Sequence, residues 1–208
     1  MKVNTKLLVL TGMLLGAIFM GAQWLAQSHS PLSEQDLVNA SLYPEPKPIN
    51  AFHLVNNLGK PFTEKELIGH WTMVFFGFTN CPSMCPTAMA VLNQMYGKLR
   101  NVPLPVIVFI SVDPKRDNLK KLGQYVQGFN PHFIGVTGSK AEIDGLTRQM
   151  SVLYIKIKPE AGSAGEYNID HSGSILLINP QGQLHAVFSM PHDADKMVKD
   201  YTTIIEHG

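Results

Sequence analysis

Cysteine and charge are both scarce in this chain of 208 residues, and the two shortages exclude several classes of protein. Only two cysteines occur, too few for a disulfide-stapled scaffold or for a four-cysteine zinc site. Charged residues make up 16% of the chain, whereas about 25% is average for a soluble protein. The formal net charge of +1 excludes a nucleic-acid-binding protein held by bulk charge, and also an acidic solvating tail.

The shortage of charge is concentrated at the N-terminus, because no charged residue occurs between Lys6 and Glu34. Within that gap, the apolar segment 7–26 is long enough, as a helix, to cross a bilayer core of about 30 Å. Lys2 and Lys6 precede the segment, so the positive-inside rule keeps the N-terminus in the cytoplasm and exports the rest. We therefore expect residues 1–27 to form a transmembrane helix that anchors the protein.

A cleaved signal peptide is the alternative for the same segment, since Ala26-Gln27-Ser28 roughly fits a cleavage site. The apolar stretch is longer than the roughly 7–15 residues usual in signal peptides, which favours a retained anchor. No Arg-rich or Ser-rich presequence is present, which argues against an organellar transit peptide. We expect a single-pass protein of the bacterial inner membrane with its C-terminal domain in the periplasm, where thiols can be oxidised.

Two regions follow the expected anchor. Residues 28–50 are polar and contain Pro44-Glu-Pro-Lys-Pro48, a sequence typical of a stiff, extended linker that lifts a domain off the membrane. In residues 51–208, continuous apolar runs at 71–78 and 106–112 predict strands buried on both faces. Because such strands alternate with helical patterns, we expect residues 51–208 to form one α/β domain with a central mixed sheet.

The remaining elements are predicted from turns, helix caps and periodicity. Pro86 is expected to open a helix, because apolar residues then recur at helical spacing. Asp117 is expected to cap a second helix, and Ser139 with Glu142 matches the capping box of a third. Other predicted elements are hairpins over 52–62 and 174–188, short strands over 133–136 and 152–158, a loop over 162–168 and a last helix over 194–207.

The cysteines are the strongest candidates for chemistry. Cys81-Pro-Ser-Met-Cys85 directly follows one predicted buried strand and directly precedes a helix, the kind of junction where ligands collect in open α/β sheets. Two thiols at positions i and i+4 can meet on one helical turn, and a helix N-terminus favours the thiolate. A structural disulfide would gain little from closing so short a loop. Redox or metal chemistry is therefore favoured over a purely structural pair.

A metal site needs a third ligand, and His171 is the candidate. It lies in the segment before the strand at Ser174, which in thioredoxin-like topologies passes beside the cysteine turn. One imidazole and two thiolates form a soft set suited to Cu(I) and able to hold Cu(II), whereas zinc would want a fourth ligand. Asp170 could orient the histidine, and Met84 could touch copper weakly. On spacing alone, however, a loop histidine is more often a solvated polar residue.

The chain resembles the Sco/SenC family from Phe52 to the C-terminus. The motifs that carry the resemblance are Phe75-Phe-Gly-Phe-Thr-Asn-Cys81-Pro-Ser-Met-Cys85-Pro-Thr87, Phe109-Ile-Ser-Val-Asp113-Pro-Lys-Arg-Asp117, Phe133-Ile-Gly-Val-Thr-Gly-Ser139 and Asp170-His171-Ser172. The resemblance implies a membrane-anchored, thioredoxin-like protein of cytochrome c oxidase assembly, with copper ligands at Cys81, Cys85 and His171. It also implies that copper passes to the binuclear copper site of oxidase subunit II, or that the thiol pair reduces the cysteines of that site.

The leading hypothesis is therefore a copper metallochaperone that binds one Cu(I) or Cu(II), rather than an enzyme. Further expected partners are another periplasmic copper chaperone or a thioredoxin-like reductant. The first alternative is a thiol–disulfide oxidoreductase in which Cys81 and Cys85 cycle without metal, although thioredoxins have two intervening residues instead of three. A peroxiredoxin-like peroxidase ranks lower, because Phe78 stands where such enzymes usually want threonine. A purely structural assembly factor would tolerate the loss of both cysteines.

Asp113 follows the second predicted buried strand and is expected at the same edge of the sheet as the cysteines. An Asp-Pro turn is the favoured interpretation of Asp113-Pro114. The functional alternative is a carboxylate that docks a partner or handles protons near the metal site.

Overall fold

The structure is a computed structural model, and it describes residues 36–158 and 167–207. The expected anchor (1–27), the first part of the expected linker and most of the predicted loop over 162–168 lie outside the described residues. Among the residues that are described, no helix combines the length and apolar character needed to cross a membrane.

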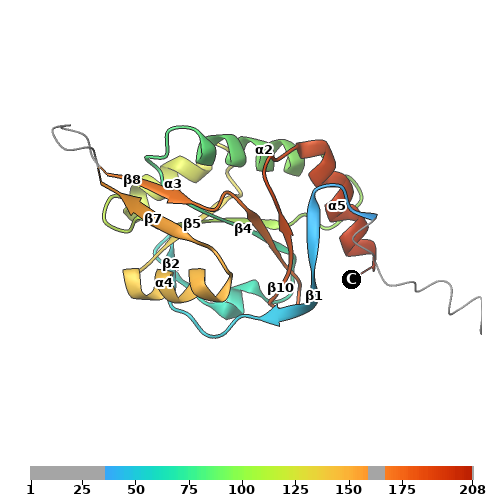
Figure 1. Ribbon diagram of the computed structural model, residues 1–208, viewed down its shortest axis with the longest axis horizontal. Coiled ribbons are helices and arrows are strands. Elements are labelled where there is room, and N and C mark those ends of the chain that lie inside the picture. Colours follow the sequence, from blue (N-terminus) through green and yellow to red (C-terminus); the bar gives the residue numbers. More distant parts are fainter. Residues whose placement is uncertain (1–35, 159–166, 208) are drawn as a thin grey trace, which may run out of the picture.

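A mixed sheet of eight strands lies at the centre of the fold, in the order β1-β10-β9-β4-β5-β6-β2-β3 (Figure 1). The strands β4, β5 and β6 are parallel, whereas β9 pairs antiparallel with β4. Every residue of β4 is buried, as its continuous apolar run predicts for a central strand. The bounds are β1 (Ala40–Pro48), β2 (Leu54–Asn56), β3 (Pro61–Phe62), β4 (Thr72–Gly77), β5 (Val106–Ser111), β6 (Ile134–Thr137), β9 (Ile175–Ile178) and β10 (Gln183–Phe188).

Helices cover both faces of this sheet. Figure 1 shows α2 and α5 close together and α4 on the opposite side of the sheet. An ion pair between Lys98 Nζ and Asp195 Oδ1, 2.6 Å apart, joins α2 to α5. The crossover helices α2 and α3 connect the parallel strands, as that topology requires. The bounds are η2 (Glu64–Leu67, a 3₁₀ helix), α2 (Met84–Lys98), α3 (Leu119–Gln127), α4 (Lys140–Gln149) and α5 (Ala194–His207).

The prediction that Asp117 caps the second helix is wrong. The cap of α3 is Asn118, whose side chain accepts a hydrogen bond of 2.9 Å from the Lys121 backbone N–H. Asp117 is buried instead, and its carboxylate accepts hydrogen bonds from the Thr79 backbone N–H (2.9 Å) and from Ser111 Oγ (2.6 Å). This carboxylate therefore joins β5 to the turn that leads from β4 into the cysteine segment.

Only one of the two hydrogen bonds of the capping box predicted for α4 is present. Ser139 accepts a hydrogen bond of 3.2 Å from the Glu142 backbone N–H, as expected for the N-cap. The Glu142 carboxylate does not close the box, because it accepts a hydrogen bond of 2.9 Å from the His53 backbone N–H. A long-range contact has replaced the local one.

Part of the segment expected as a free linker belongs to the sheet. Strand β1 pairs antiparallel with β10, from Ala40 opposite Phe188 to Pro48 opposite Gln183. Prolines fit there because β1 is an edge strand, so a missing N–H can face away from its neighbour. The buried Asp200 carboxylate of α5 accepts three further backbone N–H hydrogen bonds of 2.6–2.8 Å, from Val38, Asn39 and Ala40. The folded domain therefore begins before residue 51.

A separate two-stranded ribbon lies at one end of the molecule (Figure 1). In it, β7 (Tyr154–Ile157) pairs antiparallel with β8 (Asn168–His171). The strand expected over 152–158 is observed as β7. His171, expected in a loop, is instead the last residue of β8. The alternating exposed and buried residues of β8 turn the His171 side chain inward.

Candidate metal centre

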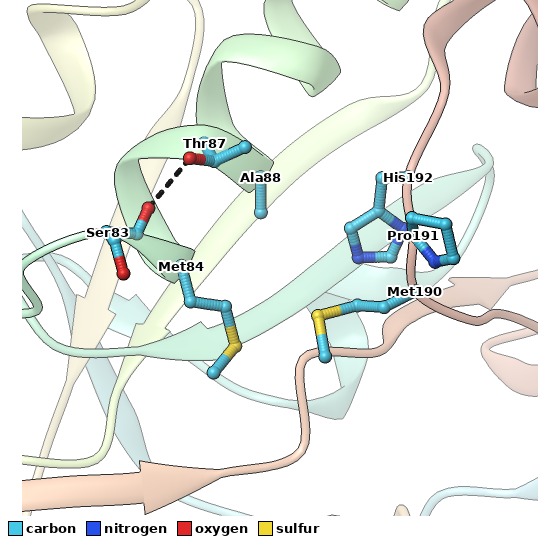
Figure 2. Close-up of a pocket in the computed structure, with 7 residues that line it drawn as sticks. All are labelled: Ser83, Met84, Thr87, Ala88, Met190, Pro191 and His192. Atoms are coloured by element: carbon cyan, nitrogen blue, oxygen red, sulfur yellow. Dashed lines mark hydrogen bonds between the residues drawn. The ribbon is translucent and has the colours of Figure 1, made fainter.

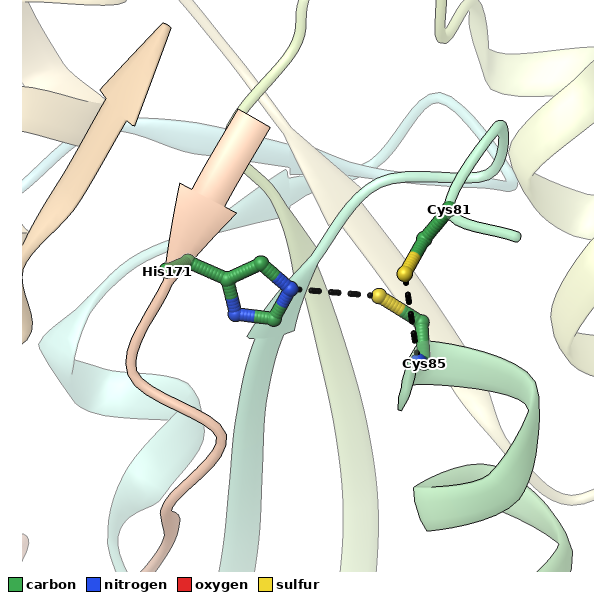
Figure 3. A group of neighbouring side chains, drawn as sticks. All are labelled: Cys81, Cys85 and His171. Carbon is green, nitrogen blue, oxygen red and sulfur yellow. Dashed lines mark hydrogen bonds between the residues drawn. The ribbon is translucent and has the colours of Figure 1, made fainter. Parts of the chain in front are cut away.

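Three side chains with metal-binding atoms meet where β4 leads into α2 (Figure 3). Cys81 lies in the turn after β4, Cys85 in the first turn of α2, and His171 at the end of β8. The two Sγ atoms and one ring nitrogen of His171 all lie within 4.8 Å of one another. The structure thus brings together all three residues predicted from the sequence.

The Cys81 sulfur is positioned by the start of α2. The N-cap residue Ser83 makes no side-chain capping hydrogen bond. Instead, the backbone N–H of Cys85 donates a hydrogen bond of 3.3 Å to Cys81 Sγ. The sulfur therefore accepts from one of the N–H groups that a helix start leaves without an intrahelical partner.

Cys85 is fully buried behind Cys81, which is partly exposed. Its Sγ atom packs over Gly77, the last residue of β4, where an added Cβ would lie only 2.9 Å from the sulfur. Burial raises the pKa of the Cys85 thiol, since a thiolate without a cation would be poorly solvated there. The metal-free protein therefore holds Cys85 as a thiol, 3.3 Å from His171 Nε2.

The His171 ring is held in the tautomer that a metal ligand requires. Its Nδ1 atom lies 3.0 Å from the carbonyl oxygen of Ser172, and a carbonyl can only accept, so Nδ1 carries the proton. Nε2 is then free of a proton and faces Cys85. Burial lowers the pKa of His171 and keeps the ring neutral, and edge-on contacts with the Phe75 and Phe78 rings fix its orientation.

Asp170 does not orient the His171 ring, as the sequence had suggested it could. Asp170 is exposed on β8, where it pairs with Ile155 across the ribbon. The orientation of the His171 ring comes from the Ser172 carbonyl instead.

A buried network of polar side chains supports the ribbon next to the site. Asp113 forms the expected turn, in which its carbonyl accepts from the N–H groups of Arg116 and Asp117. Its carboxylate pairs with the Arg116 guanidinium and accepts a hydrogen bond of 2.6 Å from the Tyr167 hydroxyl. The guanidinium also lies over the Phe78 ring, which in turn contacts His171. Asp113 thus holds the Arg116 and Tyr167 side chains in position beside the site. No spacing rule connects Asp113 to Tyr167, so the sequence alone does not predict this network.

These donors fit a single soft metal ion. Three ligands at about 2.0–2.3 Å from one ion lie roughly 3.5–4 Å apart, so atoms that are already within 4.8 Å need only small rotations. Two sulfurs and one imidazole nitrogen favour copper over harder cations. Among the described residues, no other cluster of histidine, cysteine or acidic side chains meets this distance.

The fold and the site together define a thioredoxin-like α/β protein with a candidate metal centre of two cysteines and one histidine. The chain belongs to the SCO1/SenC family, whose family model matches residues 42–206. This confirms the resemblance seen in the sequence.

Individual relatives agree with this assignment. Protein SCO1 homolog 1, mitochondrial, from Arabidopsis thaliana is 38% identical over 148 residues, which is 70% of this chain but 43% of that protein. The SCO2-like protein RP587 of Rickettsia prowazekii is 30% identical over 197 residues, 94% of each chain. The crystal structure of Arabidopsis thaliana ScoI with copper bound has a TM-score of 0.71 and 35% identity, and the match covers 76% of this chain and 98% of that one.

Proposed function

We propose that the protein is a copper metallochaperone that binds one copper ion through Cys81 Sγ, Cys85 Sγ and His171 Nε2. The observation that carries the proposal is the convergence of these three donors within 4.8 Å, with Nε2 free of a proton. The copper-bound structure of a relative with the same fold supports the choice of metal.

The arrangement suits a cargo that must be released again. On binding, the two thiols each give up a proton, while the neutral imidazole binds without losing one. Three protein ligands leave copper open to attack by a ligand of a recipient. Cys81 is the partly exposed member of the set, whereas Cys85 and His171 are buried, so exchange with a recipient would begin at Cys81.

The recipient that we propose is the binuclear copper site of cytochrome c oxidase subunit II, in line with the role that the family resemblance implies. We further propose that residues 1–27 anchor the protein in the bacterial inner membrane and that the folded domain faces the periplasm. There, another copper chaperone would supply the metal, or a thioredoxin-like protein would keep the thiols reduced. A reporter enzyme that is active only in the periplasm, fused after His207, tests whether the folded domain faces the periplasm. Reporter activity would support this location, and an inactive reporter would contradict it.

Anaerobic titration of the full-length protein with Cu(I) tests the binding site. We expect one equivalent to bind, with a thiolate-to-copper absorption band. Cys81→Ser, Cys85→Ser and His171→Ala should each weaken binding by more than the roughly 10–100-fold typical of losing a residue that only supports a ligand. The matched control is His53→Ala, because the His53 side chain is 79% exposed and belongs to another part of the fold. Undiminished affinity in the His171 variant would refute its role as a ligand.

A second candidate function is thiol–disulfide exchange by the same cysteines. The observation that favours it is their asymmetry, with Cys81 partly exposed for attack and Cys85 buried behind it to resolve a mixed disulfide. In that reaction the two thiols lose two protons and two electrons to a substrate disulfide, which becomes a dithiol. Full reductase activity in His171→Ala, together with no copper binding by the native protein, would favour this function over the first.

A further inference from the structure

A cavity of about 480 Å³ adjoins the candidate metal centre and contains two methionine side chains (Figure 2). Met84 lies in the first turn of α2, and Met190 lies in the segment between β10 and α5. Figure 2 shows both side chains extending into the same space with their sulfur ends near each other. The cavity is lined by Ser83, Met84, Thr87, Ala88, Met190, Pro191 and His192.

Gly173 shows how close the two thioethers are. A Cβ atom at this position would lie 2.4 Å from Met190 Sδ and 2.8 Å from Met84 Sδ. Because both sulfurs are near this one point, they are at most 5.2 Å apart, the sum of those distances. The absent side chain of Gly173 thus leaves room for two thioethers to converge.

The same contacts place the methionine pair beside the metal centre. Met84 directly precedes Cys85, and Gly173 follows His171 by two residues. His192 Nε2 lies 2.6 Å from the Gly173 carbonyl oxygen, which ties the Met190 segment to the chain that follows His171. Met190 is 53% exposed, whereas Cys85 and His171 are buried. Met84 is half-buried, so both methionine residues are more exposed than Cys85 and His171.

We propose that Met84 and Met190 form a second, weaker Cu(I) site that receives the ion first and passes it to Cys81, Cys85 and His171. The inference rests on the proposed copper-binding function and adds an entry step to it. Thioethers are soft, neutral donors, so they bind Cu(I) without releasing a proton and have little affinity for hard cations.

Transfer between the two sites is an exchange of ligands. The bonds from Cu(I) to the two thioether sulfurs break, and bonds to two thiolate sulfurs and to His171 Nε2 form. The thiols of Cys81 and Cys85 give up two protons to the solvent. Copper enters and leaves the methionine pair as Cu(I), so no electron is transferred and no oxidant or reductant is required.

The first test isolates the methionine site in the full-length chain. In a variant with Cys81→Ser, Cys85→Ser and His171→Ala, the acetonitrile complex of Cu(I) is added without oxygen. Methionine methyl resonances are followed by NMR. We expect shifts at Met84 and Met190 and residual binding that disappears when both are changed to leucine, which has a similar volume. Ser83→Ala, which alters the same cavity without removing sulfur, should retain the binding.

A second test avoids the triple variant, which could fail to fold. In the otherwise native chain, Met84→Leu with Met190→Leu should slow the appearance of the thiolate-to-copper band by about tenfold, without changing the final affinity. Gly173→Ala should slow the appearance of the band as well, because the added methyl group pushes both methionine side chains apart although neither thioether is removed.

The outcomes separate this inference from the proposed function. Rates unchanged by the leucine and alanine substitutions, or methyl resonances that do not respond to Cu(I), would overturn the entry site while copper still bound at the cysteines. Failure of the native protein to bind copper at Cys81, Cys85 and His171 would overturn the proposed function itself.

Discussion

Replacement of Gly77 by alanine tests how the fold positions the metal centre. Gly77 ends β4 directly below the site, and its missing side chain leaves space for two buried groups. A Cβ atom there would lie 2.8 Å from Phe109 Cε2, 3.1 Å from Phe109 Cζ and 2.9 Å from Cys85 Sγ. Normal contacts between such atoms are about 3.5–4.0 Å, so the ring and the sulfur would both have to move by roughly 0.5–1 Å.

Neither neighbour has free space to retreat. Phe109 and Cys85 are completely buried, and the Phe109 ring also contacts the rings of Phe75 and Tyr125, with centroids 6.1 and 5.2 Å away. Overpacking of this kind costs about 1–3 kcal/mol. For a domain of this size, each kcal/mol lowers the Tm by about 2–4 °C, so we expect a decrease of roughly 2–12 °C. Displacement of the sulfur should also weaken copper binding by about 10-fold or more.

Gly145→Ala is the matched control, because it makes the same chemical change in α4 where an added Cβ has no neighbour within 4 Å. Alanine favours the helix, so this variant should gain about 0.4–1 kcal/mol. Calorimetry gives both Tm values, and competition with a Cu(I) chelator gives both affinities. If Gly77→Ala matched the control in Tm and in affinity, the claim that Gly77 sets the position of Cys85 would be refuted.

Three other predictions concern stability. Asp200→Ala removes the buried acceptor of three backbone N–H groups, at Val38, Asn39 and Ala40, so the free energy of unfolding in denaturant should fall by about 3 kcal/mol or more. A loss below about 1 kcal/mol, or unchanged amide exchange there, would contradict that role. Arg116→Leu leaves the Asp113 carboxylate buried without its cation and should cost about 3–5 kcal/mol, with Arg116→Lys recovering part of it. Burial lowers the pKa of His171, His185 and His192. The unfolded chain therefore binds more protons once the pH falls below about 6.5, and the metal-free protein should lose stability there while being unaffected at higher pH. His185→Gln should make this decline shallower, and an unchanged slope would disprove the contribution of His185.

The central strands and the cysteine turn could be predicted because their signals are local. The apolar runs that form β4 and β5 are continuous, short and bounded by turn residues, which is the pattern typical of strands buried on both faces. The position of Cys81 and Cys85 then follows from chain order alone, since they come directly after β4 and open α2. The prediction of α5 at 194–207 succeeded for the same reason, as its apolar residues recur at helical spacing.

The edge strand β1 could not be predicted, because its sequence is that of a linker. Proline-rich extended chain has nearly the backbone conformation of a strand, so Pro44-Glu-Pro-Lys-Pro48 fits either structure. What decides between them is the partner strand β10, far along the chain, together with the Asp200 carboxylate that fixes the residues before the strand. Neither the pairing with β10 nor the contact with Asp200 can be recognised from the residues of β1 themselves.

The third ligand shows most clearly what sequence spacing lacks. β9 runs antiparallel to β4, with Ile175 opposite Phe75 and Leu176 opposite Val74. Each step backwards from Ile175 therefore corresponds to a step forwards from Phe75, which brings His171 alongside the turn that carries Cys81. The sequence supplies both apolar strands but neither their direction nor their register, so it could nominate His171 without placing it. The histidine meets the cysteines because an antiparallel pair of central strands delivers both ligand segments to the same end of the sheet.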